Sequence, residues 1–400
     1  MIIAMSGAEQ GVRRVAWRGW GRRRDLRLAY SLEGEANRLL DKEQWAAGEA
    51  ALRRVVELRG RWLAADSLPV LVARHNLAMG LFVMRRHEEA AAEVLEVLPA
   101  LVAAWGEEDP MPINTRLLLS VSLLRLRRFE ESEEQCRLVL ACHTAVDDVR
   151  VKAIRSQALA LVGLGRYREA TEVLEAFLRE AVPVLGAGHP DVLKARILVL
   201  NQLAVLAEHE VVERECQDLL DTLDERDPQH GQVAGIRVYQ LNDTGRHTEA
   251  ETTAREALAH HSQLALHIGL ARSLNGQARH HEALHALADA QTQPRADSAG
   301  WKVLTSSVAA QALLGLGHLD QAEAKALQAV QAAEEAGLAP TRHRALEAAT
   351  TLGLVLAAQG RHIEAQQHLT RTTTAWHDHY GPHHPRTLAS QAELATLQRL

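Results

Sequence analysis

The chain has 400 residues, of which 47% are hydrophobic and 4% aromatic, and its formal net charge is −6. Alanine and leucine are abundant and β-branched residues form no alternating runs, so the composition excludes a strand-rich protein and predicts an all-α fold. The modest charge gives no general attraction to nucleic acid, and no run of about 18 apolar residues predicts a membrane span. No charged leader with an apolar core opens the chain, so we expect a cytoplasmic protein.

The first element is a basic amino-terminal extension, residues 1–28. Seven arginines between Arg13 and Arg27, set against two acidic residues, give residues 1–30 a charge of +5 and leave −11 for the rest. Such a run could contact phosphates of nucleic acid or an anionic membrane surface, with Trp17 and Trp20 as stacking or interfacial side chains. We favour a mobile or partly helical arm, or an upstream start codon, because seven charges produce a local field and not a fold.

From about residue 29 onward one phrase recurs: a turn, a ring or bulky residue that we call the pivot, and in most units a small residue three positions later. The nine pivots, 33 to 43 residues apart, are Trp45, His87, Phe129, Tyr167, His209, His247, His280, Leu319 and His362. Six positions before the pivots stand the leucines Leu39, Leu81, Leu123, Leu161, Leu203, Leu241, Leu274, Leu313 and Leu356. This leucine register is independent of the residues that define the pivots. A period near forty residues predicts stacked helical hairpins, with helix A ending before the turn and helix B beginning at the pivot.

Glycine marks four of the turns between helix A and helix B. Gly165, Gly245, Gly317 and Gly360 each stand two residues before a pivot. Glycine adopts the left-handed conformation that ends a helix without strain, so helix A is expected to stop there. Because a single hairpin buries too little surface to be stable alone, we expect the units to fold as one cooperative stack.

A linker precedes some of the A helices. It reads LGAGHPDVL from Leu185 and YGPHHPRTL from Tyr380, and WGEEDPMPI from Trp105 is a variant of it. Pro110 and Pro190 each stand nineteen residues before a pivot. The linker therefore keeps the same register as the turns.

The repeat, the linker pattern Gly-x-x-His-Pro-x-x-Leu and helix starts such as RHN at residues 74–76 resemble the tetratricopeptide repeat family over about residues 29–400. The long period is similar to that of the kinesin light chain-type subgroup. The resemblance implies a right-handed superhelical solenoid of about nine stacked antiparallel helix pairs, with a C-terminal capping helix from Pro385. Residues 230–280 depart from the pattern, with no His-Pro linker and one unit of 33 residues, so we expect the stack to bend or slip there.

One segment matches the zinc-peptidase motif HExxH, in which two histidines four residues apart bind zinc and the glutamate acts as base. It is His281-Glu282-Ala283-Leu284-His285. The repeat itself explains the Glu-Ala pair, which occurs at the same place in four other units, and no GxxH extension follows. We therefore expect no enzyme and no metal site, and keep His281 and His285 as the least favoured alternative.

Histidines also gather near the C-terminus, at His377, His379, His383 and His384. Their type suits a metal, but the last belongs to the linker, and histidines within one turn are usually exposed to solvent. No phosphate-binding loop with Gly-Lys-Ser/Thr is present, and three scattered cysteines predict neither disulfides nor a thiolate zinc site. We expect no cofactor.

The resemblance implies that helix A lines the concave face, with ligand-facing positions fifteen, twelve, eleven and eight residues before each pivot. The polar side chains that we expect to line a peptide-binding groove there are His75, Asn76, Asn114, Lys152, Arg155, Ser156, Lys194, Asn201, Tyr239, Arg272 and Gln311, with Gln232 and Glu347 in the later units. Asparagine amides can hold the backbone of an extended peptide, and lysine and arginine bind carboxylates, so the expected ligand is an acidic segment or a carboxy-terminal carboxylate. Apolar positions such as Leu117 and Ile197 would grip apolar side chains or simply pack against neighbouring helices.

These observations predict a non-enzymatic scaffold or adaptor that holds an extended protein or peptide segment in its groove, in regulation or complex assembly. The nearest alternative is an intracellular receptor, in which a small signalling peptide closes the superhelix and changes what its outer face binds. A zinc-dependent hydrolase would rest on the HEALH segment alone. The sequence predicts neither the oligomeric state nor the identity of the partner.

Overall fold

The structure is a computed structural model that describes residues 7–293 and 296–399, with side chains from residue 21 onward. Regular structure in these residues is helical throughout, so the predicted all-α class is confirmed. Every helix among them is too short or too polar to span a bilayer. The helices of this part of the chain are α1 (Gly7–Asp41), α2 (Trp45–Gly60), α3 (Leu68–Val83), α4 (His87–Trp105), α5 (Pro110–Arg125), α6 (Phe129–Ala141), α7 (Asp147–Gly163), α8 (Tyr167–Leu185), α9 (Pro190–Val205), α10 (His209–Thr222), α11 (Pro228–Asp243), α12 (His247–Leu258), α13 (Leu264–Gly276), α14 (His280–Gln291), α15 (Ala299–Gly315), α16 (Leu319–Glu335), α17 (His343–Ala358), α18 (His362–Tyr380) and α19 (Pro385–Leu397).

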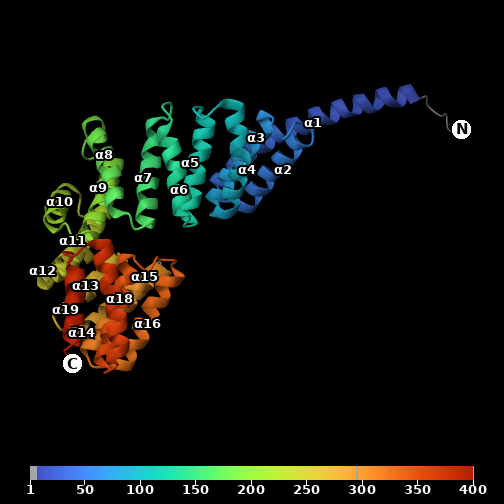
Figure 1. The fold of residues 1–400 in the computed structure, drawn as a ribbon. Coiled ribbons are helices and arrows are strands. Elements are labelled where there is room, and N and C mark those ends of the chain that lie inside the picture. The colour runs from blue at the N-terminus through green and yellow to red at the C-terminus, as the bar shows by residue number, and fades with distance from the viewer. Residues whose placement is uncertain (1–6, 294–295, 400) are drawn as a thin grey trace. The chain divides into compact units, whose positions relative to one another are not determined.

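The chain divides into two compact units (Figure 1), one ending at Leu164 and the other beginning at Gly165. Helices α1 to α7 form unit 1, and α8 to α19 form unit 2. Predicted hairpin partners pack together in both units, such as α3 with α4 and α15 with α16. The predicted helical solenoid is therefore confirmed, and a single cooperative stack over residues 29–400 stays a prediction.

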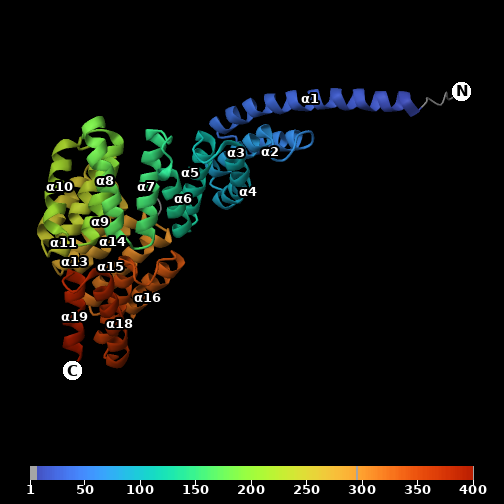
Figure 2. The ribbon, with the colours of Figure 1, turned by 45° about the horizontal axis from the view of Figure 1, so that its top comes forward.

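Helix α1 contains the described part of the basic extension. It is continuous through residue 28, so the predicted boundary lies inside the helix, and its amino-terminal part extends beyond α2 (Figure 2). Asp25 joins α1 to the end of α2, since Trp62 Nε1 donates to its carboxylate at 2.9 Å and Arg61 lies 3.3 Å away. The Trp62 hydrogen bond is the main reason that the pKa of Asp25 is lowered. Arginine side chains before residue 21 lie outside the described residues, and the four arginines from residue 22 to residue 27 are exposed.

All nine pivots occupy the predicted place, because each is the first residue of an even-numbered helix. Seven of the nine leucines are buried, and Leu39 and Leu203 are half-buried. The register continues through the 33-residue unit, so the expected slip at residues 230–280 is wrong. That unit is short because α12 has 12 residues and α13 only 13, against 16 or 17 in the odd-numbered helices from α3 to α11 and in α15 and α17.

Every turn from helix A to helix B has the same backbone geometry. The residue two before the pivot has a positive φ in each of the nine units. Five of these residues carry a side chain: Glu43, Arg85, Arg127, Ala207 and Ala278. The next amide donates to the carbonyl of the repeated leucine, as from Arg279 to Leu274 at 2.9 Å. This is the Schellman cap, which favours glycine because a Cβ is strained at positive φ.

We expect opposite effects from exchanging glycine and alanine at two of these turns. Gly317 has a φ of 74° and faces open space, so Gly317→Ala adds only backbone strain. It should lower the free energy of unfolding by about 1 kcal/mol, and Ala278→Gly at the exposed turn of φ 59° should raise it by up to about 1 kcal/mol. Urea denaturation followed by circular dichroism measures both, and shifts of the same sign would contradict the shared geometry.

The linkers begin A helices with a shared cap. Four linker residues precede a proline and accept a hydrogen bond from the amide two residues on, at 2.8 to 3.3 Å: Asp109, His189, Asp227 and His384. The side chain satisfies an amide that the helix leaves free, and proline at the first position needs no hydrogen-bond acceptor. The Asp227 linker stands just before the stretch in which the sequence showed no His-Pro pair, and it was missed because it has Asp224 in place of the linker glycine as well as aspartate in place of histidine.

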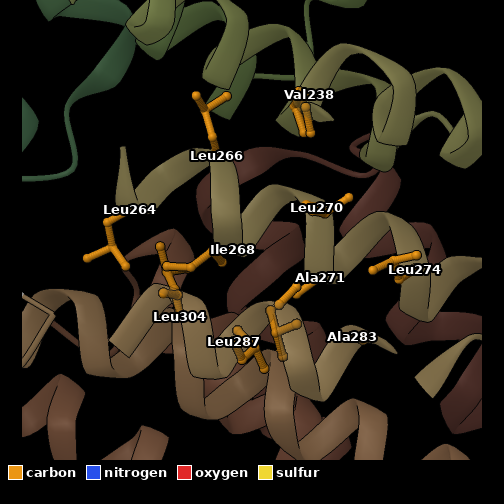
Figure 3. Packing of buried hydrophobic residues seen from close by; sticks show 14 of the residues in the cluster. Val238, Leu264, Leu266, Ile268, Leu270, Ala271, Leu274, Ala283, Leu287 and Leu304 are labelled. Atoms are coloured by element: carbon orange, nitrogen blue, oxygen red, sulfur yellow. The ribbon is translucent and has the colours of Figure 1, made fainter. Parts of the chain in front are cut away.

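An extended apolar cluster fixes the register of residues 230–280. It lies between α11, α13, α14 and α15 (Figure 3). Leu266 and Ala271 of α13 are fully buried, with Val238 of α11 and Ala283 of α14 in the same cluster. Small residues let these helices approach closely, so the short unit still shares a core with its neighbours.

Candidate functional site

The odd-numbered helices form the inner layer of each unit. Neighbouring odd-numbered helices contact one another, as α3 with α5 and α5 with α7 in unit 1, and successively from α9 to α19 in unit 2. Within the described residues, neighbouring even-numbered helices show no comparable contact. In a curved stack the more closely spaced layer is the concave one. All predicted groove residues lie on odd-numbered helices.

In unit 1, two predicted groove residues brace the inner layer and a third is buried. His75 Nδ1 lies 2.8 Å from Thr115 Oγ1 of α5, and Asn76 Nδ2 donates to Glu33 of α1 at 2.9 Å. Burial lowers the pKa of His75, which favours a neutral ring at pH 7. Ser156 of α7 is buried. These side chains stabilise the packing of the inner helices of unit 1.

The inner helices α5 and α7 also carry three more accessible predicted groove residues: Asn114, Lys152 and Arg155. Asn114 is exposed and its amide donates to the carbonyl of Pro110 in its own helix at 2.7 Å. Lys152 is exposed and pairs with Asp148, one turn away, at 2.5 Å. Arg155 is half-buried, and no carboxylate of the described residues lies within ion-pair distance of it. Exposed pairs of this kind are worth little, so these cations can exchange partners.

Apolar side chains are also exposed on the inner helices of unit 1. Met79 and Val83 of α3 are 42% and 48% exposed, and Tyr30 of α1 is 77% exposed. Met79 stands eight residues before its pivot, one of the positions that the resemblance assigns to the ligand. Leu117 and Ile197 are buried, so at these two predicted positions the side chains pack within the chain.

Lys194, Asn201 and Gln311 lie on inner helices of unit 2. Lys194 is exposed, 3.7 Å from Asp191, and Asn201 is exposed and donates to a carbonyl of its own helix at 2.9 Å. Gln311 is half-buried and donates to Thr351 of α17 at 3.4 Å. The two exposed residues use their polar groups only within their own helix.

Tyr239 and Arg272 meet in a charged centre of unit 2. Arg272 pairs with Glu347 of α17 and lies 3.9 Å from Asp243 of α11. Arg386 of α19 pairs with Asp243 and lies 3.7 Å from Glu347. The arginine and carboxylate charges therefore alternate, and we call these four residues the ionic centre. Three of its side chains are 10% exposed or less, and Arg386 is 28% exposed.

The ionic centre has unused hydrogen-bonding capacity. Arg272 Nη1 and Glu347 Oε2 are buried and have no hydrogen-bond partner among the described residues. The Arg272 guanidinium lies 5.0 Å over the ring of Tyr239, whose pKa is raised by burial and by the charge of Asp243. Because buried polar atoms without partners are costly, these two atoms mark a place for a ligand or a water molecule.

An aromatic cluster joins the last helices of unit 2 to its first ones. His384 stacks on Trp376 at 5.6 Å, and its Nε2 lies 3.1 Å from the carbonyl oxygen of Val205 in α9. Its Nδ1 accepts the capping bond of α19, so Nε2 carries the proton and donates. Tyr380 lies 6.1 Å from Tyr167 at the start of α8. Figures 1 and 2 both place the start of α19 close to α11. Unit 2 therefore closes on itself, whereas repeats of a solenoid ordinarily contact only their neighbours.

His343 lies between the ionic centre and the aromatic cluster. Its ring is 5.0 Å from that of Trp376, and the Tyr239 hydroxyl is 3.4 Å from its nitrogens. Burial lowers the pKa of His343 well below its usual value, and the positive charge of Arg386 acts in the same direction. The fold therefore holds this histidine neutral.

We expect unit 2 to lose stability as the pH falls from 7.5 to 5. Burial also lowers the pKa of His384, so below about 6.5 the unfolded chain binds protons that these folded histidines do not. Stability is complete above that pH and should fall by up to about 1.4 kcal/mol per pH unit for each such histidine. Urea denaturation at several pH values measures this. His343→Gln should flatten the dependence, and equal stability of the natural chain at pH 7.5 and 5.5 would contradict it.

The metal candidates do not come together. His281 and His285 are exposed on the even-numbered helix α14, and His285 Nδ1 lies 3.6 Å from Asp289. Glu282 accepts a hydrogen bond from Arg279 at 2.7 Å, the ion pair that other units form between the same positions. Of the four C-terminal histidines, three are exposed and one is buried. In the part of the chain that the structure describes, no three metal-ligating side chains are placed to hold an ion.

The sequence register identified Arg272 and Glu347 as groove positions but missed Asp243 and Arg386. Asp243 stands four residues before its pivot, outside the four ligand-facing positions that the resemblance implies. Arg386 lies within the last linker, on a helix that has no pivot. Their meeting depends on the closure of unit 2, for which the sequence offers no local signal.

The family model of the tetratricopeptide repeat matches residues 345–386, which span most of α17 and all of α18. The predicted resemblance to this family is therefore confirmed. No match to the chain was found among the curated proteins.

Three solved structures illustrate the similarity of fold. The Rap protein complexed with Competence and Sporulation Factor is 12% identical, with 82% of this chain and 98% of that chain covered and a TM-score of 0.51. Kinesin light chain TPR-like repeats of Podosopora anserina are 18% identical, with 55% and 97% covered and a TM-score of 0.42. The Cut9–Hcn1 hetero-tetramer of the APC/C is 12% identical, with 93% and 86% covered and a TM-score of 0.41. At these identities the likeness concerns the fold alone.

Proposed function

We propose that this tetratricopeptide-repeat chain is a protein-binding scaffold that holds an extended segment of a partner against its inner helices. One observation carries the proposal: the odd-numbered helices stand side by side, and those of unit 1 expose apolar and polar side chains together. Exposed apolar groups grip side chains of an extended peptide, and neighbouring amides bind its backbone. Scaffolding of this kind needs no catalytic group.

The partner segment is proposed to be acidic or to end in a free carboxylate. Lys152 and Lys194 are exposed on inner helices and hold only weak pairs within their own helices. Arg155 has no carboxylate partner among the described residues. Asn114 on α5 and Asn201 on α9 add exposed amides. Within each unit, cations and amides on inner helices favour carboxylates and peptide backbone.

A receptor for a small signalling peptide is the second candidate. The Rap protein, which shares the fold, was solved with Competence and Sporulation Factor bound. In the present chain, the observation that favours such a function is the closure of unit 2 through the contact of α19 with α9 and α11. A ligand that binds the closed and open states unequally would shift the equilibrium between them.

Capture of partners from a cell extract tests whether the inner helices are the binding surface. The full chain is compared with the double variant Lys152→Glu, Lys194→Glu and with the control Arg168→Glu, Arg371→Glu, which changes the charge equally on exposed sites of even-numbered helices. We expect the natural chain and the control to recover the same proteins and the first variant to lose them. Equal recovery by all three would show that the inner wall is not the binding surface.

A photo-crosslinking residue gives a second readout. Placed at Met79 on the inner layer, it should cross-link the partner that the capture identifies, whereas the same residue at the exposed Ile363 of α18 should not. Cross-linking from Ile363 alone would assign binding to the outer helices.

A further inference from the structure

We propose that the ionic centre is a carboxylate-exchange site. An acidic segment of the partner replaces the chain's own two carboxylates on Arg272 and Arg386, and this exchange opens the closure of unit 2. The inference rests on the proposed function, and it adds where an acidic segment binds in unit 2 and what limits its access.

The two closest ion pairs of the centre join helices that are not neighbours in the stack, whereas its contacts of 3.9 Å and 3.7 Å join neighbouring helices. Arg272 and Glu347 are 75 residues apart, on α13 and α17, and Arg386 and Asp243 are 143 residues apart, on α19 and α11. In each pair at least one other odd-numbered helix lies between the two in the order of the stack. Breaking these pairs therefore leaves the hairpins and their apolar cores intact, so unit 2 can open without unfolding.

Exchange of one carboxylate for another avoids the main cost of opening a buried ion pair. A buried arginine that loses its partner is strongly destabilising, because its charge remains out of water without compensation. An incoming glutamate or aspartate side chain, or a terminal carboxylate, gives Arg272 a carboxylate partner in place of Glu347. The displaced carboxylate of the chain then gains contact with water, which offsets the desolvation of the ligand.

The centre also has the donor that an incoming carboxylate requires. Arg272 Nη1 is buried, lies 3.9 Å from Asp243 and has no hydrogen-bond partner among the described residues, so it can donate to an incoming carboxylate once the closure begins to open. Arg386 is 28% exposed, which gives the ligand a path from solvent. An apolar or uncharged segment would leave both arginines unpaired, so the chemistry selects an acidic ligand.

Arg344 provides a place for first contact. It is the second residue of α17, its side chain is exposed, and no carboxylate of the described residues lies within ion-pair distance of it. Its guanidinium lies 5.4 Å over the ring of Trp301, which leaves the N–H edge free for a carboxylate. The nearby Arg342 and Arg272 add positive charge around Arg344. An anion that reaches Arg344 therefore meets an excess of positive charge.

Binding of a defined acidic peptide tests the exchange. The probe is fluorescent hexaglutamate blocked at both ends, measured by anisotropy on the full chain, with hexaglutamine as the uncharged comparison. Glu347→Gln removes a competing carboxylate, and Glu393→Gln removes an equal charge from an exposed site of α19. We expect Glu347→Gln to bind hexaglutamate about fivefold more tightly than Glu393→Gln, or more. Equal affinities would overturn the proposal, and Asp243→Asn repeats the test if Glu347→Gln fails to fold.

The point of first contact is tested with a charge reversal. Arg344→Glu should weaken hexaglutamate binding at least tenfold relative to Arg371→Glu, an exposed control on α18. An alanine peptide with a free C-terminus, compared with its amide, shows whether a terminal carboxylate serves as well as acidic side chains. Equal binding by Arg344→Glu and its control would remove Arg344 from the site.

Hydrogen exchange separates opening from simple surface binding. Hexaglutamate should accelerate amide exchange in α19 of the natural chain, and hexaglutamine should not. Binding without faster exchange in α19 would overturn the exchange mechanism but leave the scaffold proposal intact. The exchange mechanism would also be overturned, with the scaffold proposal intact, by a second result. In that result, partner capture is lost in the Lys152→Glu, Lys194→Glu variant but unchanged in Glu347→Gln.

Discussion

Replacing Arg272 by methionine should lower the free energy of unfolding by about 3 kcal/mol. Methionine keeps much of the side-chain volume but leaves Glu347, which is 4% exposed, without its direct partner. Arg386, 3.7 Å from the Glu347 carboxylate, offsets part of the loss. Removal of one member of a buried pair is costly because the remaining charge stays out of water.

A double variant separates loss of charge pairing from loss of packing. Arg272→Met combined with Glu347→Met should recover most of the stability, because an apolar pair of similar volume leaves no buried charge. Arg255→Met is the control, since Arg255 is exposed and Glu251, one turn away, keeps its pair with Arg279, so the change should cost about 0.5 kcal/mol or less. Urea denaturation followed by circular dichroism measures all three. If Arg272→Met is no less stable than Arg255→Met, the ionic centre is solvated.

The hairpins could be predicted from the sequence because their signals are local. A leucine six residues before the pivot supplies the carbonyl that closes helix A, so Leu274 and His280 define one turn wherever that turn lies in the fold. The positive φ was visible only where the residue is glycine. At Ala278 and Arg127 the hairpin imposes the same conformation, and the residue type gives no indication of it.

The linker shows the limit of a motif that is defined by residue types alone. Read as a glycine followed three residues later by His-Pro or Asp-Pro, it missed Asp227, although aspartate at this position accepts the same capping bond as His189. The physical requirement is a side-chain acceptor before a proline, and both residue types meet it. Reading the pattern as a cap would have predicted the start of α11.

The candidate site could be predicted only in part. The register correctly placed Tyr239, Arg272 and Glu347 on inner helices, but it gave no sign that they would meet one another. Arg386 joins them because α19 returns to α11, and such a contact depends on the summed curvature of many repeats. No short stretch of sequence encodes that sum, so the ionic centre could be found only from the structure.

Trp376→Ala should lower the free energy of unfolding by about 3–5 kcal/mol. Trp376 is 1% exposed, and its Nε1 donates to the Thr350 hydroxyl at 3.2 Å. Its ring stacks on His384 and meets His343 edge-on at 5.0 Å. Alanine would therefore leave a cavity among α17, α18 and the start of α19. Ile363→Ala, on the same helix but at a site 76% exposed, is the control and should change stability by about 0.5 kcal/mol or less.

Trp376→Ala should also destabilise the contact with α9, because His384 lies between the Trp376 ring and the carbonyl of Val205. Without the ring, the imidazole loses the surface that orients its Nε2, and the hydrogen bond to α9 should weaken. Hydrogen exchange at the end of α9 and in α19 should therefore accelerate in Trp376→Ala, beyond the change in α17 and α18. Trp376→Phe, which retains an aromatic surface, should show a smaller increase. Faster exchange confined to α17 and α18 would mean that the closure of unit 2 does not depend on this tryptophan.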